Sequence, residues 1–226
     1  MDAISLADYH HGRNNPRAMA YQNKVDAEAI ENSRWVVEPF KLLNCSRETD
    51  GASALLLVSA ERAKDFRQKP IYLLGSAIGA PHGGGVTAHN WSDAEYALGG
   101  FSSIARRLWE NTGLSPADVD VAQVYENFSG PGVAALIEHG FCSVEGAGEF
   151  FTLENLIAPN GKLPINTDGG CLAEGFVHGM GGTVEAIRQL RGESANPVVN
   201  AKVCLVTGGP ASTLSSSALF GTSDTL

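Results

Sequence analysis

The sequence has few cysteines, few charges and no long apolar run. Its four cysteines, Cys45, Cys142, Cys171 and Cys204, form no C-x-x-C pair and have no histidine cluster beside them. This spacing argues against a zinc site and a disulfide framework, so we expect reduced thiols and no bound metal. No apolar stretch approaches the ~18 residues of a membrane span, and the first residues do not resemble a signal peptide. We therefore expect a cytoplasmic protein without a membrane span.

Basic residues are scarce as well. The net charge is −9 and there is no Lys/Arg-rich run, so the chain lacks the electrostatic footprint of a nucleic-acid-binding protein. Apolar residues make up 43% of the chain, and its 26 glycines exceed the average usage of about 7%. A chain of 226 residues can bury a proper core in one large domain or two small ones.

Apolar periodicity and turn residues predict strands that alternate with helices through most of the chain. Buried strands are predicted at 54–58, 71–78, 119–125 and 202–207, and an alternating strand at 212–220. Helices are predicted at 26–37, 59–66, 130–139 and 183–191, with one more that a capping box opens at 92–95 and Gly113 ends. This alternation predicts an α/β layer structure.

The first forty residues are predicted to lie outside the main domain. Residues 1–24 are polar and locally basic, with His10, His11 and Arg13 among them, which is typical of an exposed loop or arm. A flexible terminus is favoured here over a basic loop that meets an anionic ligand. We therefore assign residues 1–40 to an exposed arm and loop region and residues 41–226 to the domain proper.

One glycine-rich stretch is a candidate binding site: LPINTDGGCLAEGFVHGMGG at 163–182. A polar triplet at 166–168 precedes Gly169 and Gly170, and a helix is predicted shortly afterwards. Paired glycines permit a close approach of backbone or ligand, and a helix start offers free N–H groups. The stretch fits equally well a ligand held against the backbone or a tight turn that leads into a buried helix.

Polar side chains follow the strand predicted at 119–125. Tyr125, Glu126 and Asn127 lie at its carboxyl end, where open α/β sheets bind ligands. Tyr125 or Glu126 is a candidate acid or base; the alternative is that Glu126 caps the next helix while Tyr125 packs. Function is slightly favoured, because a polar cluster is costly between two buried elements. For His178, a hydrogen-bonded core position is favoured over catalysis.

Seven segments in order resemble the C-terminal half of the thiolase superfamily: DGASALLLVS, DVDVAQVYENF, GFCSVEGAGEF, LPINTDGG, FVHGM, EAIRQLRGE and VCLVTGGP. The resemblance is strongest to the lipid-transfer-protein or sterol-carrier-protein-X branch, which includes aldolases of steroid side-chain degradation. It covers nearly the whole chain. It implies an α/β fold, the C-terminal half of a thiolase-like layered α-β-α sandwich, and the handling of acyl-CoA thioesters.

Four positions depart from the thiolase pattern. The nucleophilic cysteine of the family lies in its N-terminal half, so none of the four cysteines matches it. The histidine of the family's G-H-P motif falls at Phe176, where the aldolase branch prefers tyrosine. The acid/base cysteine falls at Leu205 or Val206, one or two places after Cys204, and the asparagine or histidine of the N-E-A-F-like motif corresponds to Tyr125. Without a nucleophile no acyl-enzyme can form, so we do not expect thiolase activity from this chain alone.

The resemblance implies a site and partners. Tyr125 would act as acid/base or polarise a carbonyl, with His178 and Glu126 in support. The residues expected to contact substrate are Asn127, Phe176, Gly169, Gly170, Gly208 and Gly209. Coenzyme A would enter as part of the substrate, with steroid-derived acyl groups as one candidate class and no covalently bound cofactor.

Whether the chain is enzymatic depends, in this interpretation, on a missing N-terminal half. Together with such a half, or with a thiolase-like partner chain in a homo- or hetero-oligomer, it would belong to an acyltransferase or retro-aldolase. A zinc-ribbon/OB-fold protein is a further candidate partner. The alternative is a non-catalytic subunit that binds acyl-CoA or lipid or serves as a scaffold. An uncovered face between the halves predicts self-association or instability of the chain alone.

Overall fold

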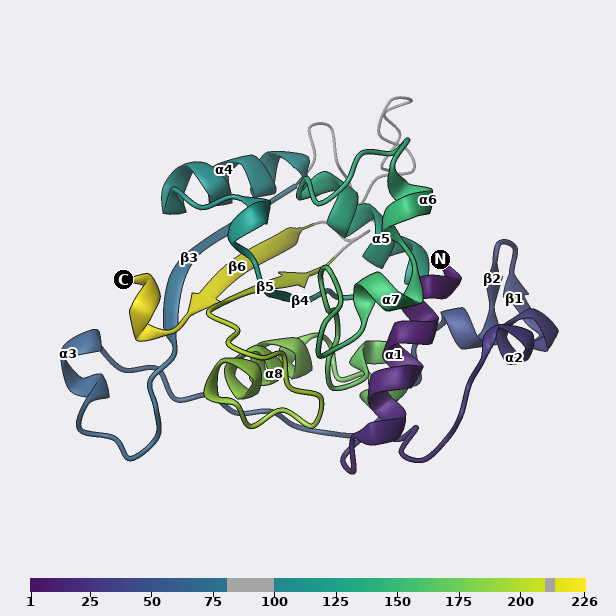
Figure 1. Ribbon diagram of the computed structural model, residues 1–226, viewed down its shortest axis with the longest axis horizontal. Coiled ribbons are helices and arrows are strands. Elements are labelled where there is room, and N and C mark those ends of the chain that lie inside the picture. The colour runs from purple at the N-terminus through teal and green to yellow at the C-terminus, as the bar shows by residue number, and fades with distance from the viewer. Residues whose placement is uncertain (81–99, 210–213) are drawn as a thin grey trace.

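A computed structural model describes residues 1–80, 100–209 and 214–226. Its centre is a four-stranded mixed sheet in the order β3-β6-β5-β4 (Figure 1). Strand β6 pairs antiparallel with both neighbours, whereas β4 and β5 are parallel. The strands are β3 (Tyr72–Gly79), β4 (Val121–Gln123), β5 (Val203–Gly208) and β6 (Ser215–Gly221). The carboxyl ends of β4 and β5 therefore lie side by side.

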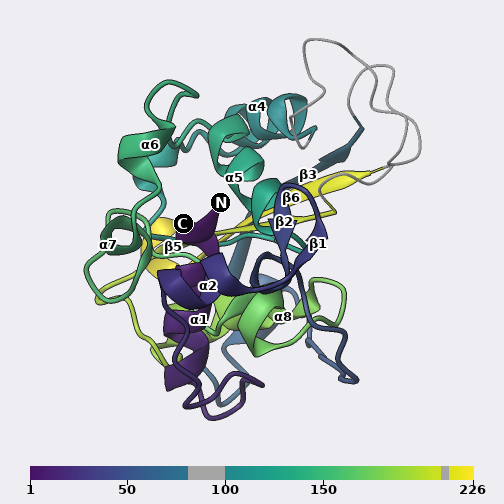
Figure 2. The ribbon, with the colours of Figure 1, turned by 90° about the vertical axis from the view of Figure 1, so that its right-hand side faces the viewer.

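Helices cover both faces of this sheet. On one face lie α4 (Ser102–Thr112) and α5 (Ser129–Glu138), and on the other lies α8 (Met180–Arg191) (Figures 1 and 2). The short elements are α2 (Ala27–Asn32), β1 (Trp35–Val37), β2 (Phe40–Lys41), η1 (Leu42–Asn44), α3 (Ala60–Ala63), η3 (Pro116–Asp118), α6 (Ala147–Phe150), α7 (Leu153–Leu156), the π-helical turn η4 (Gly170–Glu174) and η5 (Ser223–Thr225). Helix α1 (Asp2–Asn14) packs against α5 and against the shorter elements α2, η1, α7 and η4.

The core is divided by the sheet. The larger cluster fills the side of α1, α4 and α5 and includes Leu108, Leu136 and Leu205. A smaller cluster lies under α8 and includes Ala186 and Leu190. Alternate residues of β6 are buried, as the sequence pattern predicted for this strand. The described helices include none that is long and apolar enough to cross a membrane.

The prediction of a buried strand at 54–58 is wrong. The segment forms no strand, and Leu56 and Leu57 are 75% and 79% exposed. A uniformly apolar run forms a buried strand only where other segments cover it. No other described part of this chain covers residues 54–58. Strand β3 does form close to the predicted 71–78, but none of its residues is buried, and Leu73, Ser76 and Ile78 are exposed.

The prediction of an exposed arm at 1–24 is also wrong for residues 2–14. Residues 2–14 form α1, in which Ile4, Ala7 and Tyr9 are buried. The segment looked like a loop because the helix also buries polar side chains, among them Asp8 and His11, against the rest of the chain. Only part of the helix predicted at 26–37 forms, as α2, and β1 follows it.

The remaining helices follow the prediction more closely. Helix α5 forms over the predicted range, and α8 begins three residues earlier than predicted. The buried face of α8 carries the polar residues Glu185 and Gln189, whereas the apolar Val184 and Ile187 are only half-buried. The capping box at 92–95 lies outside the described residues, although α4 ends at Gly113 as expected.

Candidate functional site

The site begins where β4 and β5 end. The chain leaves β4 through Val124 and Tyr125, and the backbone N–H of Tyr125 donates to Oγ1 of Thr207 on β5 at 3.0 Å. The Val124 N–H donates to Oδ1 of Asn166 at 2.8 Å, which places the turn at 166–175 beside the strand ends. Sequence-distant segments thus meet at the carboxyl edge of the parallel pair, the edge at which such sheets bind ligands.

Three rings from two of these segments contact one another, with tilted planes, at this edge. Tyr125 and Phe176 have ring centroids 5.9 Å apart, and Phe176 and His178 are 4.8 Å apart. Burial, followed by the neighbouring Cys171 and Glu126, raises the pKa of Tyr125 to about 12. The phenol therefore keeps its proton at neutral pH, where it can donate a hydrogen bond to a carbonyl oxygen.

A cleft of about 670 Å³ opens beside these rings. Tyr125 and His178 line it together with Gly208 and Gly209 at the end of β5, so the structure brings together four of the predicted site residues. The outward residues Ser216, Ala218 and Phe220 of β6 form another part of its wall. This volume lies within the range of small-molecule sites. His178 is exposed at a positive φ of 57°, so the core position favoured from the sequence is wrong.

Other predicted residues lie beside or beneath the cleft. Asn127 and Phe176 are not among the described residues that line it; Asn127 is half-buried, and its Oδ1 accepts from the Phe128 N–H at 3.1 Å. Glu126 is completely buried beneath Tyr125, and its Oε1 accepts from the Cys171 N–H. Burial raises the pKa of Glu126 to about 7.

The two paired glycines are explained by packing within the chain. At Gly169, with φ +114°, a Cβ would lie 2.8 Å from Cα of Gly12 in α1. At Gly170, a Cβ would lie 2.2 Å from Oε1 of Glu126. Both positions therefore require glycine for the turn to fit between α1 and Glu126.

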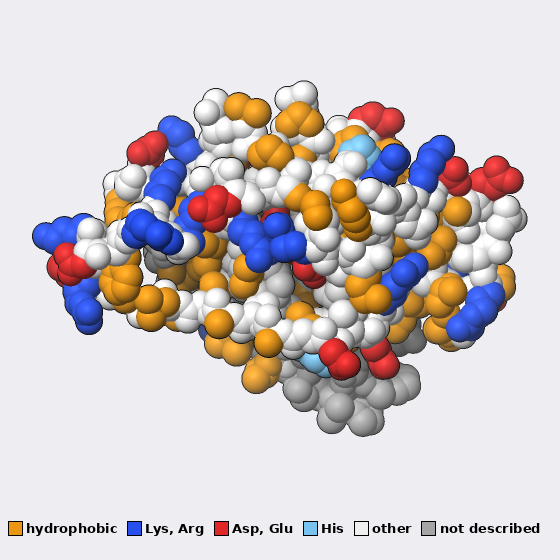
Figure 3. All heavy atoms as spheres, turned by 90° about the horizontal axis from the view of Figure 1, so that it is seen from below, with side chains coloured by type: hydrophobic (Ala, Val, Ile, Leu, Met, Phe, Trp, Pro, Cys, Tyr) orange, Lys and Arg blue, Asp and Glu red, His pale blue; other side chains and the backbone are white. Residues whose placement is uncertain are grey.

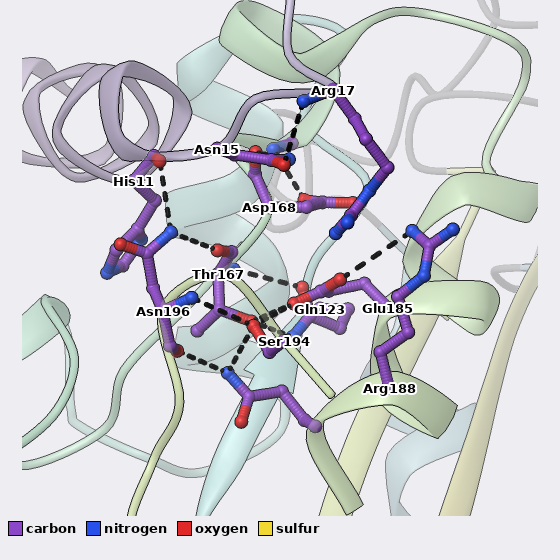
Figure 4. Close-up of polar contacts among 12 residues, drawn as sticks. His11, Asn15, Arg17, Gln123, Thr167, Asp168, Glu185, Arg188, Ser194 and Asn196 are labelled. Carbon is purple, nitrogen blue, oxygen red and sulfur yellow. Dashed lines mark hydrogen bonds and ion pairs between the residues drawn. The ribbon is translucent and has the colours of Figure 1, made fainter. Parts of the chain in front are cut away.

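A buried polar network supports the turn, and the sequence did not reveal most of it (Figure 4). Oγ1 of Thr167 receives a hydrogen bond from Nε2 of Gln123 and donates to Oε1 of Glu185, both at 3.0 Å. Nδ2 of Asn196 donates to the carbonyl oxygens of both Thr167 and His11, at 2.8 and 3.0 Å. The polar triplet at 166–168 is visible in the sequence. Its hydrogen-bond partners lie in other elements, and no local sequence pattern predicts them.

The network also includes contacts with the acidic residues Asp168 and Glu185 around the turn. Nδ2 of Asn15 donates to the carbonyl oxygen of Asp168 at 2.9 Å, and Nη1 of Arg188 lies 3.9 Å from Oε2 of Glu185. Burial raises the pKa of Asp168, while Arg188 and Arg17 oppose the shift. The described residues contain no group of three or more metal-ligating side chains arranged to hold a metal ion.

The fold is that of a thiolase half. The family model "Thiolase C-terminal domain-like" matches residues 83–221, and the chain belongs to this thiolase family. It is 41% identical over 207 residues to 17-hydroxy-3-oxo-4-pregnene-20-carboxyl-CoA lyase of Mycobacterium tuberculosis, covering 92% of this chain and 53% of that protein. It is 36% identical over 214 residues to the steroid side-chain-cleaving aldolase of Thermomonospora curvata, covering 93% and 54%.

A solved structure agrees with these relatives. The Ltp2-ChsH2(DUF35) aldolase superposes with a TM-score of 0.91 at 34% identity, over 97% of this chain and 57% of that one. The thiolase-like α/β fold expected from the sequence is therefore confirmed. The chain spans about half the length of the curated relatives it matches.

Proposed function

We propose that this chain forms the C-terminal half of a thiolase-like aldolase that cleaves a carbon–carbon bond in a CoA thioester, with steroid-derived acyl chains as the leading substrate class. The observation that carries the proposal is the position of Tyr125, a phenol on the cleft wall just beyond the carboxyl end of β4. The relatives named as a CoA lyase and a side-chain-cleaving aldolase support the same chemistry.

The thiols of this half do not supply the nucleophile that acyl transfer needs. Cys45, Cys171 and Cys204 are buried and Cys142 is half-buried. Burial raises the pKa of all four thiols, and for Cys171 and Cys204 it does so well above the usual range. A reactive cysteine needs exposure and a lowered pKa. Cleavage by a retro-aldol route requires no acyl-enzyme, which is why we favour it over acyl transfer for the chemistry at this edge.

The retro-aldol step assigns a role to each polar group on the wall. A base removes the proton of the substrate's β-hydroxyl, and that oxygen becomes the carbonyl oxygen of the leaving aldehyde or ketone as the Cα–Cβ bond breaks. The electron pair of the broken bond moves into the thioester to give an enolate, which then takes up a proton at Cα. Tyr125 would donate a hydrogen bond to the developing enolate oxygen. His178, exposed on the same wall, would take the hydroxyl proton. Glu126 is buried and would position Tyr125 without touching substrate.

Replacement of Tyr125 tests this assignment in the complete assembly, that is, the chain together with its N-terminal half. Because Tyr125→Phe removes the donor and keeps the ring, we expect kcat to fall about 10²–10³-fold. Tyr21→Phe, which alters an exposed tyrosine 44% accessible to solvent, is the matched control. Steady-state assays with a β-hydroxyacyl-CoA measure both. Unchanged turnover of Tyr125→Phe would remove this residue from the mechanism.

The proposal includes a partner. The apolar segment at 54–58 is exposed, and the chain spans about half of its relatives, so a second chain or segment that supplies the N-terminal half would cover it. The solved aldolase is a complex that names ChsH2(DUF35) as its other component, and this supports a hetero-oligomer here too. A zinc-ribbon/OB-fold protein remains our candidate for such a component.

A second candidate function is a non-catalytic subunit that carries acyl-CoA or lipid. Phe176 favours it, because a ring without a hydroxyl occupies the place between Tyr125 and His178. Calorimetric titration of the chain with a medium-chain acyl-CoA and with free CoA separates the candidates when it is combined with the cleavage assay. Micromolar binding without cleavage in the complete assembly would support the carrier.

A further inference from the structure

Two buried carboxyl groups lie against each other behind the cleft. Asp8 of α1 and Glu126 after β4 both have no solvent exposure, their charges interact, and each carboxyl has one oxygen without a hydrogen-bond partner among the described residues. Ionised carboxylates only accept hydrogen bonds. A hydrogen bond between the two side chains therefore requires one of them to be protonated.

The surrounding bonds leave room for one shared proton. Oδ1 of Asp8 accepts from Nδ2 of Asn166 at 3.1 Å, and Oε1 of Glu126 accepts from the Cys171 N–H. The second oxygens, Oδ2 of Asp8 and Oε2 of Glu126, receive no hydrogen bond from any N–H or hydroxyl of the described residues. A buried oxygen without a donor is costly, and a proton between the two carboxyls satisfies both.

The groups that face the pair do not neutralise a second negative charge. They are Asp168 and Cys171 from the turn, Tyr9 from α1 and Tyr125 after β4, while α5 faces Glu126 with Gly132. The nearby guanidinium groups of Arg17 and Arg188 act on Asp168 instead. Two carboxylates without a cation between them cannot both ionise cheaply.

We propose that Asp8 and Glu126 share one proton, and that this shared proton clamps α1 to the turn at Gly170–Cys171 beneath Tyr125. Asp8 is then a positioning residue, because it acts on the cleft only through Glu126 and the turn. Only the purpose of this positioning rests on the proposed function. The shared proton itself is testable without substrate.

The proton gives stability a definite pH dependence. Burial raises the pKa of Glu126 to about 7, and burial together with Glu126 raises the pKa of Asp8 well above its usual range. In the unfolded chain both ionise near pH 4. The folded state therefore binds more protons above about pH 4, and its stability falls as the pH rises through about 7 and beyond.

Replacement of Asp8 by asparagine tests the shared proton, because the amide N–H₂ donates to Glu126 at every pH. For the full 226-residue chain we expect the melting temperature to fall between about pH 5 and pH 9, and to fall less in Asp8→Asn by at least ~3 °C. The pKa values of Glu174 and Glu185 are also raised to about 7. These two residues contribute equally to the pH dependence of stability in the unaltered chain and in Asp8→Asn. Asp65→Asn, on the exposed surface, is the matched control.

A spectroscopic measurement keeps the test independent of stability. Infrared spectroscopy of the folded chain at about pH 8 should show a protonated-carboxyl band that Asp8→Asn removes and Asp65→Asn keeps. If Asp8→Asn shows the same band and the same melting profile as the unaltered chain, the shared proton is disproved. Loss of aldolase activity in Tyr125→Phe bears only on the proposed function.

Hydrogen exchange tests the clamp. In Asp8→Ala, Glu126 keeps no partner in α1, so we expect faster amide exchange across residues 166–175 in mass spectrometry. Asp8→Asn should retain the protection of the unaltered chain. Should Asp8→Ala exchange as slowly as Asp8→Asn, the pair does not hold the turn and the clamp is overturned.

Discussion

At Gly179 the backbone lies directly against the ring of Tyr125. The residue has φ +87°, and a Cβ built on it would lie 2.9 Å from Cδ2 of the Tyr125 ring. His178, the residue before it, is itself held at a positive φ. The ring that would polarise the substrate is therefore held in place by a backbone that only glycine can form at this point.

Gly179→Ala should move the Tyr125 ring. We expect it to lower kcat of the complete assembly at least about tenfold, because a small displacement of a donor is costly in a catalytic site. Gly192→Ala is the matched control, since Gly192 has φ +76° and no atom within 4 Å of a Cβ. Both variants carry the strain of a positive φ, about 1 kcal/mol. Equal activity of the two would show that contact with Tyr125 does not matter.

Phe176 contributes a ring but no proton donor at the same edge of the sheet. Its ring contacts both Tyr125 and His178 but carries no hydroxyl. Among the described residues that line the cleft, Tyr125 is the only phenol. Among the described lining residues, proton donation by a phenol therefore depends on Tyr125.

At the scale of elements, α1 is the support of the turn. Its His11 accepts a hydrogen bond at Nε2 from the Ala158 N–H at 2.9 Å, and burial lowers the pKa of His11 to about 3. Its C-cap Asn15 binds the carbonyl of Asp168. These bonds join segments 153 and 147 residues apart in the chain, so the shape of the turn depends on contacts with α1.

Asn15→Ala should destabilise the fold, since it leaves the buried carbonyl of Asp168 without this donor. We expect a loss of about 1–3 kcal/mol in the free energy of unfolding, measured by urea denaturation. Asn14→Ala is a matched neighbour, because Nδ2 of Asn14 makes only an exposed bond to the carbonyl oxygen of His10. A loss in Asn15→Ala no larger than that in Asn14→Ala would contradict the supporting role of α1.

At the scale of the whole molecule, part of the apolar surface lies uncovered. Leu56 and Leu57 are more than 70% exposed, and Figure 3 shows hydrophobic side chains among Lys and Arg on the underside of the molecule. Large exposed apolar patches mark interaction sites. Together with the half-length match to its relatives, this surface is what a chain that functions with another half would present.

Leu56→Ser combined with Leu57→Ser should weaken binding to the N-terminal half. Burying one leucine side chain contributes about 1.5–3 kcal/mol, so loss of both should raise Kd more than about a hundredfold. Val144→Ser with Val199→Ser, at two sites 65% and 69% exposed, is the control. Analytical ultracentrifugation with the co-expressed half measures both pairs. Unaltered affinity in the leucine variant would place the interface elsewhere.

The sequence by itself determined the elements whose signals are local. The buried strand β5, the alternating strand β6 and helix α5 follow from apolar period and turn residues, and the ordered motifs identified the thiolase half. Tyr125 was found because a polar group at the end of a buried strand is costly without a purpose.

Only the tertiary structure decided what depends on distant contacts. The polarity of Asp8 and His11 indicated a loop until their partners at 126 and 158 were placed beside them. The apolar run at 54–58 indicated burial, although no described part of this chain covers it. Residue type reports a preference for water or for burial, whereas the atoms that satisfy that preference are supplied by segments far away in the sequence.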